Sequence, residues 1–149
     1  MYICRPFSRI GLFIVLTFGV TAMLYGCQTM STMMPPNPNT SVSFSSQILP
    51  IFASNCASCH QSGGFANQQG ITMFLTAADA YNTTVNKLSE QDPSLTRIIP
   101  GNSAQSLLYL KISSTTPPVG SRMPLFALPL SNSDITLIKD WIDQGALNN

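Results

Sequence analysis

Apolar residues recur at helical spacing in four stretches of the chain, and proline- and glycine-rich segments separate these stretches. The first predicts a helix from about Ser46 to the mid-fifties. Ile48 and Phe52 lie four residues apart on one face, and Pro50 falls in the first turn, where a missing N–H costs little.

The last stretch carries the fullest set of helix signals. Ser131 is the predicted N-cap, and Asp134 occupies the capping-box position. The apolar stripe of this helix consists of Ile135, Ile138, Trp141 and Ile142. Gly145 then ends the helix.

Two shorter helices are predicted between these. One has Thr76 as N-cap with Asp79 three residues later, and the other begins at Asn102 or Ser103. The apolar residues of the second of these are Leu107, Leu108, Leu110 and Ile112. No strand alternation of any length is present, so we expect an all-α domain with long loops.

The N-terminus reads as an export signal. Arg5 and Arg9 precede an uncharged stretch, Ile10 to Leu24, that is shorter than the roughly 20 apolar residues of a membrane span. The ending Leu24-Tyr25-Gly26-Cys27 resembles a bacterial lipobox, which implies that residues 1–26 are removed and that Cys27 is lipidated. An uncleaved anchor or an ordinary signal peptide is the alternative. In each case the domain lies outside the cytoplasm, in the periplasm or on the extracytoplasmic surface.

Residues 27–45 predict a flexible tether, because the segment after Cys27 has no charge, three prolines and no sustained periodicity. Met30, Met33 and Met34 cluster there, and thioethers suit Cu(I), but nothing nearby completes a copper site. The domain itself is predicted over residues 46–149.

Composition narrows the possible functions of this 149-residue chain. Seven Lys and Arg residues give no basic face for nucleic acid, and 44% hydrophobic residues with little charge argue against disorder. Loss of residues 1–26 would leave five basic and six acidic residues. The carboxylates form no pair, and the one histidine allows neither a triad nor a multi-histidine metal site, so we do not expect an enzyme.

The motif that carries chemistry is Cys56-Ala57-Ser58-Cys59-His60. Two thiols three apart, with a histidine directly after them, form the attachment signature of c-type haem: the thiols reach the two vinyl groups and the histidine lies under the iron. A thioredoxin-like site would need a βαβ context, and a zinc site would need further Cys or His ligands. A disulfide here would close too small a loop to stabilise much.

A second axial ligand would come from a methionine. Met123 follows Pro117-Pro118 and precedes Pro124, and this rigid loop suits a thioether held at fixed distance from a metal. Met73 lies in an apolar run, which favours packing against a haem edge or the core. Met123 is therefore the first candidate, with Met73 or an open position as alternatives.

These motifs together resemble a class I mono-haem cytochrome c, and they are most similar to the planctomycete-type cytochrome c domain. The stretches that carry the resemblance span about residues 46–148 and are Ile48–Phe52, Cys56–His60, Ile99–Asn102, Ser106–Leu108, Met123-Pro124 and Leu130–Ala146. The resemblance implies one covalent haem c on Cys56 and Cys59, with His60 and Met123 as axial ligands. It also implies that the first and last helices cross, with Phe52 against the Ile138–Ile142 face.

The expected function is single-electron transfer between redox partner proteins, with a lipid anchor to the membrane. A gas-binding or sensory c-type haem protein is the alternative, but such bundles usually carry the motif near the C-terminus, and here 89 residues follow His60. A haem subunit of a larger redox complex is the third reading, which the sequence does not separate from a free carrier.

Overall fold

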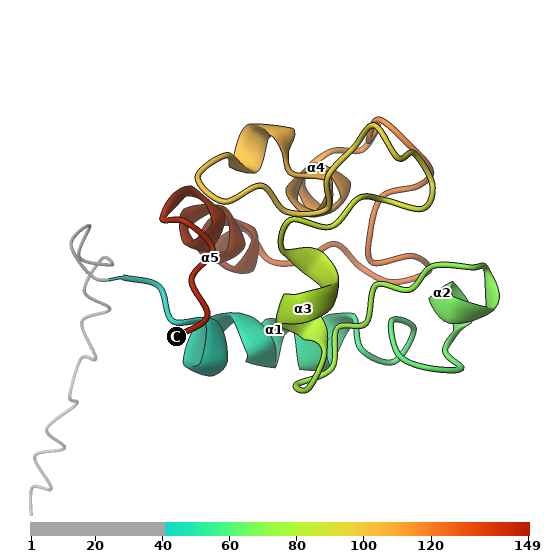
Figure 1. Cartoon of the computed structure of the whole chain (residues 1–149), viewed down its shortest axis with the longest axis horizontal. Coiled ribbons are helices and arrows are strands. Elements are labelled where there is room, and N and C mark those ends of the chain that lie inside the picture. Colours follow the sequence, from blue (N-terminus) through green and yellow to red (C-terminus); the bar gives the residue numbers. More distant parts are fainter. Residues whose placement is uncertain (1–40) are drawn as a thin grey trace, which may run out of the picture. The chain divides into compact units, whose positions relative to one another are not determined.

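Helices joined by long loops build residues 41–149, the part of the chain that the computed structural model describes (Figure 1). In chain order the helical segments are η1 (Phe44–Ile48, a π-helix), α1 (Leu49–Asn55), α2 (Phe65–Gln68), α3 (Ala80–Thr84), η2 (Ser103–Gln105, a 3-10 helix), α4 (Leu107–Ser113) and α5 (Asn132–Asp143). Within residues 41–149 there is no strand, only isolated bridges at Val85–Ile98 and Leu88–Thr96. The predicted all-α class is confirmed. None of the helices in this part of the chain is long and apolar enough to cross a membrane.

Helix α5 forms where the sequence predicts it. The Ser131 hydroxyl accepts a hydrogen bond from Asp134 N (3.1 Å) and donates one to the Asp134 carboxylate (2.8 Å). Gly145 follows the helix with φ +102°, a conformation that costs glycine little. The buried residues of the helix are Ile138, Trp141 and Ile142.

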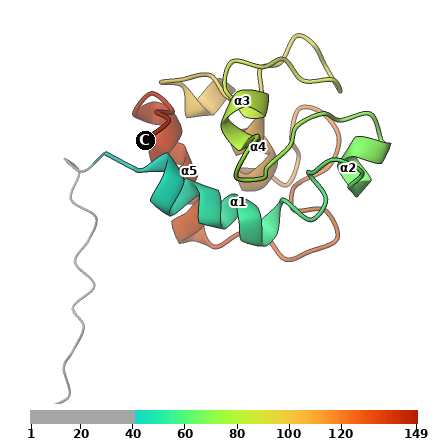
Figure 2. The ribbon, with the colours of Figure 1, turned by 60° about the horizontal axis from the view of Figure 1, so that its bottom comes forward.

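An aromatic cluster joins the first and last helices. Phe44 stacks on Trp141 (ring centroids 5.2 Å apart) and meets Tyr81 edge-on (5.4 Å). Phe52 contacts Trp141 in a T-shaped pair (6.5 Å), so the expected contact between Phe52 and the Ile138–Ile142 face is confirmed. In Figures 1 and 2, α5 lies beside the start of the η1–α1 helix.

The first helical segment begins two residues earlier than predicted. Val42 and Phe44, which the sequence placed in the tether, are buried in the core. Hydrogen bonds attach this segment to the C-terminus: Val42 N donates to Gln144 Oε1 (2.7 Å), Phe44 N to Asn149 Oδ1 (2.7 Å) and Ser45 N to Asn149 O (2.8 Å). These tertiary contacts explain the earlier start.

The two middle helices are shorter than predicted. Thr76 does not cap α3; it begins a turn in which its hydroxyl donates to Asp79 (2.8 Å), and the helix starts at Ala80. Asn102 does cap a helix, but only η2. Ser106 then interrupts the chain in an extended conformation, because its hydroxyl bonds to the backbone at residues 99 and 102, and α4 starts after it. The four-residue α2 was not predicted.

Candidate functional site

The Cys56–His60 motif forms one tight turn at the end of α1. Cys59 N and His60 N both donate to the Cys56 carbonyl (3.1 and 2.9 Å), so the two cysteines and the histidine are held close together. Both thiols are free; Cys56 is half-buried and Cys59 is exposed. The turn therefore presents two unlinked thiols beside an imidazole.

The state of the Cys56 thiol separates two kinds of chemistry. Burial raises the pKa of Cys56 to about 11, with a further contribution from Cys59. Redox-active cysteines of the thioredoxin type depend on the opposite shift, toward a stable thiolate. The Cys56 thiol is therefore protonated at neutral pH, in contrast to such a thiolate.

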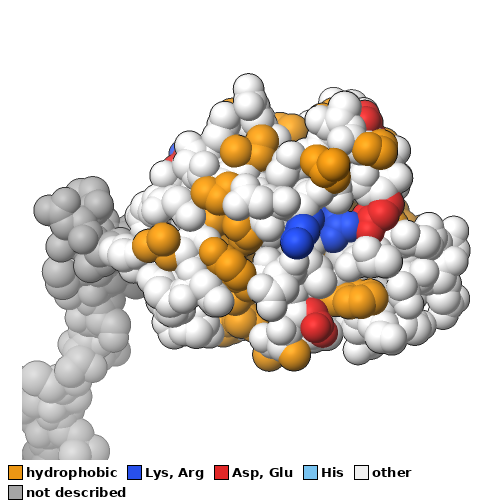
Figure 3. All heavy atoms as spheres, viewed as in Figure 1, with side chains coloured by type: hydrophobic (Ala, Val, Ile, Leu, Met, Phe, Trp, Pro, Cys, Tyr) orange, Lys and Arg blue, Asp and Glu red, His pale blue; other side chains and the backbone are white. Residues whose placement is uncertain are grey.

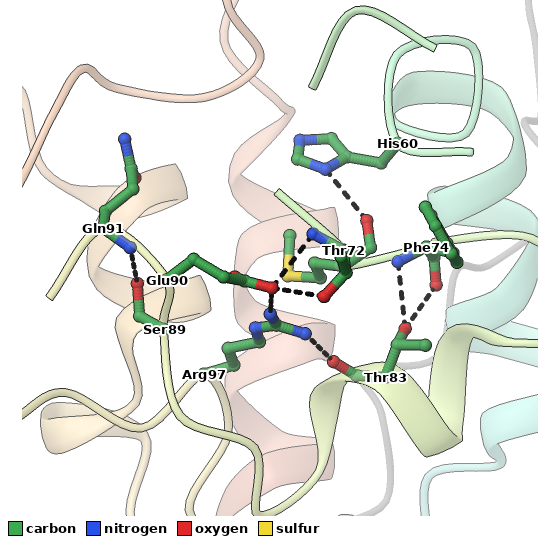
Figure 4. A network of polar contacts seen from close by, with 9 residues as sticks. His60, Thr72, Phe74, Thr83, Ser89, Glu90, Gln91 and Arg97 are labelled. Carbon is green, nitrogen blue, oxygen red and sulfur yellow. Dashed lines mark hydrogen bonds and ion pairs between the residues drawn. The ribbon is translucent and has the colours of Figure 1, made fainter. Parts of the chain in front are cut away.

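His60 is buried, and one backbone carbonyl fixes how its ring is protonated. His60 Nδ1 lies 3.2 Å from the Met73 carbonyl oxygen (Figure 4). A carbonyl can only accept, so the proton belongs on Nδ1, and Nε2 keeps its lone pair for a metal. Burial lowers the pKa of His60; the hydrogen bond to Met73 raises it, and the charges of Lys111 and Arg97 lower it again. The imidazole is thus neutral at pH 7, the form that binds metals.

A network of polar contacts holds the segment that carries this carbonyl. Glu90 forms an ion pair with Arg97 and accepts hydrogen bonds from Thr72 N (3.0 Å) and the Thr72 hydroxyl (Figure 4). Burial raises the pKa of Glu90, but its hydrogen bonds with Thr72 and Arg97 outweigh this and lower the pKa to about 2. Glu90 is therefore ionised at neutral pH and fixes the residue before Met73.

The other side of the segment is tied to α3 and to the motif. The Thr83 hydroxyl donates to the Phe74 carbonyl (2.7 Å) and accepts from Phe74 N (3.0 Å), while Arg97 donates to the Thr83 carbonyl. Leu75 N donates to the His60 carbonyl (2.7 Å). The carbonyl that faces the imidazole thus belongs to a segment held on both sides.

Met73 and Met123 line the same hollow, which is small and partly open to solvent. Met123 N donates to the Lys111 carbonyl (2.8 Å), which ties the methionine loop to α4. The other lining residues are Ile71, Ser89, Glu90, Gln91, Arg97, Leu107, Leu108 and Lys111. The structure therefore places both candidate methionines on one hollow, and it joins Met73 to His60 through a hydrogen bond.

Residues 41–149 contain no group of three or more His, Cys, Asp or Glu side chains placed to bind a metal ion. The groups in residues 41–149 that could contact the haem expected from the sequence are two thiols in one turn, a neutral imidazole, thioethers beside a hollow and a buried amine that has no hydrogen-bonding partner in this part of the chain. Cys27 and the methionines of the tether lie outside the described residues.

Sequence reasoning missed four residues of this site. It placed Met73 as a packing residue, whereas its backbone carbonyl orients His60, and it gave Glu90, Arg97 and Lys111 no role. The scarcity of charge in the chain was the one available signal, because each of so few charged residues is a candidate for a specific role.

Comparison with known proteins gave no match: no family model, no curated protein and no solved structure matches the chain.

Proposed function

We propose that this chain is a mono-haem c-type cytochrome that transfers single electrons outside the cytoplasmic membrane. The observation that carries the proposal is the turn after α1, where two free thiols lie beside the chain's single histidine, whose Nε2 is left available by the bond from Nδ1 to Met73. When bound, the haem would supply an Fe(III)/Fe(II) couple.

The residues of the chain take distinct roles in this proposal. Cys56 and Cys59 would hold the haem covalently, each through a thioether to one of its two vinyl groups. Nε2 of His60 would bind the iron, and the Met73 carbonyl keeps that imidazole oriented. Met123, on a loop attached to α4, would supply a second ligand to the iron.

Outside the described residues, Cys27 would carry the lipid that holds the protein to a bacterial membrane, and the tether would give the haem domain reach toward a donor and an acceptor protein. Radioactive palmitate should label the wild type and a Cys4→Ala control, because Cys4 lies in the signal peptide, but it should not label Cys27→Ala. Equal labelling of all three, or none, would contradict the anchor.

Visible spectra of the intact protein, oxidised and reduced, together with acid-acetone extraction, test the haem. The haem should resist extraction and remain on the chain in a denaturing gel. Cys56→Ala and Cys59→Ala should each leave at most one thioether and mature poorly, while Ser58→Ala, a change inside the same turn, should leave the attachment intact. A protein without haem ends the proposal, and a freely extracted haem excludes covalent attachment.

A further inference from the structure

Lys111 is a buried cation for which residues 41–149 provide no partner. Its residue lies near the end of α4 and is only 8% exposed, and Nζ makes no hydrogen bond within residues 41–149. A buried ammonium group is strongly unfavourable unless it is paired, and burial accordingly lowers the pKa of Lys111. The partner of this amine is therefore to be sought outside the described chain.

Lys111 lines the hollow together with Met73 and Met123. Its amine lies beside Gly120: a Cβ at this glycine would come within 2.9 Å of Lys111 Nζ, 3.0 Å of Gln91 Nε2 and 3.4 Å of Gln91 Oε1. Two donors, an ammonium and a side-chain amide, thus converge beside a residue that has no side chain.

Of the two cations that line the hollow, only Lys111 has no anionic partner within residues 41–149. Arg97, the other cation that lines it, is already neutralised by Glu90. Glu90 in turn is engaged by Thr72, so it is not free to serve Lys111. An ammonium and an amide that converge favour a carboxylate, whose two oxygens accept from both.

We propose that Lys111, with Gln91 beside it, binds a carboxylate of the haem, one of the two propionates on its edge. This assignment rests on the proposed function. It also gives Lys111 a role in setting the reduction potential, because Fe(III) carries one more positive charge than Fe(II) and a nearby cation disfavours the oxidised state. Lys111 is here a binding and tuning residue, and the iron ligands are unchanged.

The first test compares Lys111→Gln with Lys87→Gln, which removes the same charge from an exposed lysine. At a fixed electrode potential, Lys111→Gln should raise the Fe(III)/Fe(II) ratio by about tenfold, the size expected of one unit charge at about 10 Å in a medium of effective dielectric constant about 20. Lys87→Gln should change the ratio far less. Equal changes in the two variants, or none in Lys111→Gln, would overturn the assignment.

A second measurement needs no variant. In the NMR spectrum of the reduced wild type, the Lys111 ε-methylene protons should show a nuclear Overhauser contact with the methylene protons of one propionate. If haem is bound and this contact is absent, the carboxylate assignment fails while the cytochrome proposal stands. If the wild type lacks the sulfur-to-iron band and acquires it only in Lys111→Gln, the amine binds iron instead, which also overturns the assignment. If no haem is bound, the proposed function itself has failed.

Discussion

The role of His60 depends on its place in the motif and on the group that orients its ring, and only the first can be predicted from the sequence. The spacing of Cys56, Cys59 and His60 is local, so the motif could be predicted from five consecutive residues. The group that orients the imidazole is the backbone carbonyl of Met73, thirteen residues away, and every residue has such a carbonyl. No side-chain pattern could have identified this carbonyl, because the fold of the backbone determines which carbonyl lies next to the imidazole.

The two candidate methionines can be separated by substitution. Met123→Ala should abolish the weak far-red sulfur-to-iron band of the ferric protein, lower the reduction potential and open the iron to carbon monoxide. Met73→Ala should leave all three largely intact, because Met73 acts on His60 through its carbonyl, which alanine keeps. Visible spectra, potentiometry and carbon monoxide binding provide the measurements. Rapid carbon monoxide binding by the wild type with no far-red band would favour the sensory protein over the carrier.

At the scale of the element, the helices that carry their own end signals were predicted well, and those defined by distant partners were not. The capping box of Ser131 and Asp134 lies within four residues, and α5 follows it. The start of η1 depends on Phe44 reaching Trp141, about a hundred residues further along the chain, and a local pattern contains no such information. The interruption at Ser106 is of the same kind, since its hydroxyl bonds to Asn102 and Ile99 across a turn.

The ion pair of Glu90 should make the stability of the segment at Thr72 depend on pH. Folding lowers the pKa of Glu90 from an ordinary 4.5 to about 2, so this contribution to the free energy of unfolding is fully present well above pH 4.5 and is lost as the pH falls toward 2. Urea unfolding of the wild type and Glu90→Gln should show the wild type more stable at about pH 6, with the difference shrinking toward acid. A difference that stays constant over this range would show that the charge of Glu90 contributes nothing.

At the scale of the whole molecule, the two ends of the described chain close on each other through Phe44. Its ring is 3% exposed and contacts Phe52, Tyr81 and Trp141. We expect Phe44→Ala to lower the free energy of unfolding by about 3–5 kcal/mol, because it leaves a cavity in the core. The matched control is Phe126→Ala, because Phe126 is 89% exposed. This substitution should lower the free energy of unfolding by about 0.5 kcal/mol or less. Urea unfolding measures both, and comparable losses would mean that Phe44 does not close the core.

The scarcity of charge predicts how the molecule should meet other proteins. Residues 41–149 carry five basic and six acidic side chains, and Figure 3 shows a face on which few of them are present. Two of the largest exposed apolar residues, Phe126 and Leu128, extend from the loop that follows Met123. With a net charge near zero, electrostatic repulsion or steering between two copies is weak, and added salt has little to screen.

The rate of electron self-exchange between oxidised and reduced protein, measured by NMR line broadening, should therefore change by less than about twofold between about 0.01 and 0.2 M salt. A steep dependence would instead mean that the encounter uses a concentrated patch of charge, and apolar contact at this loop would no longer explain the encounter.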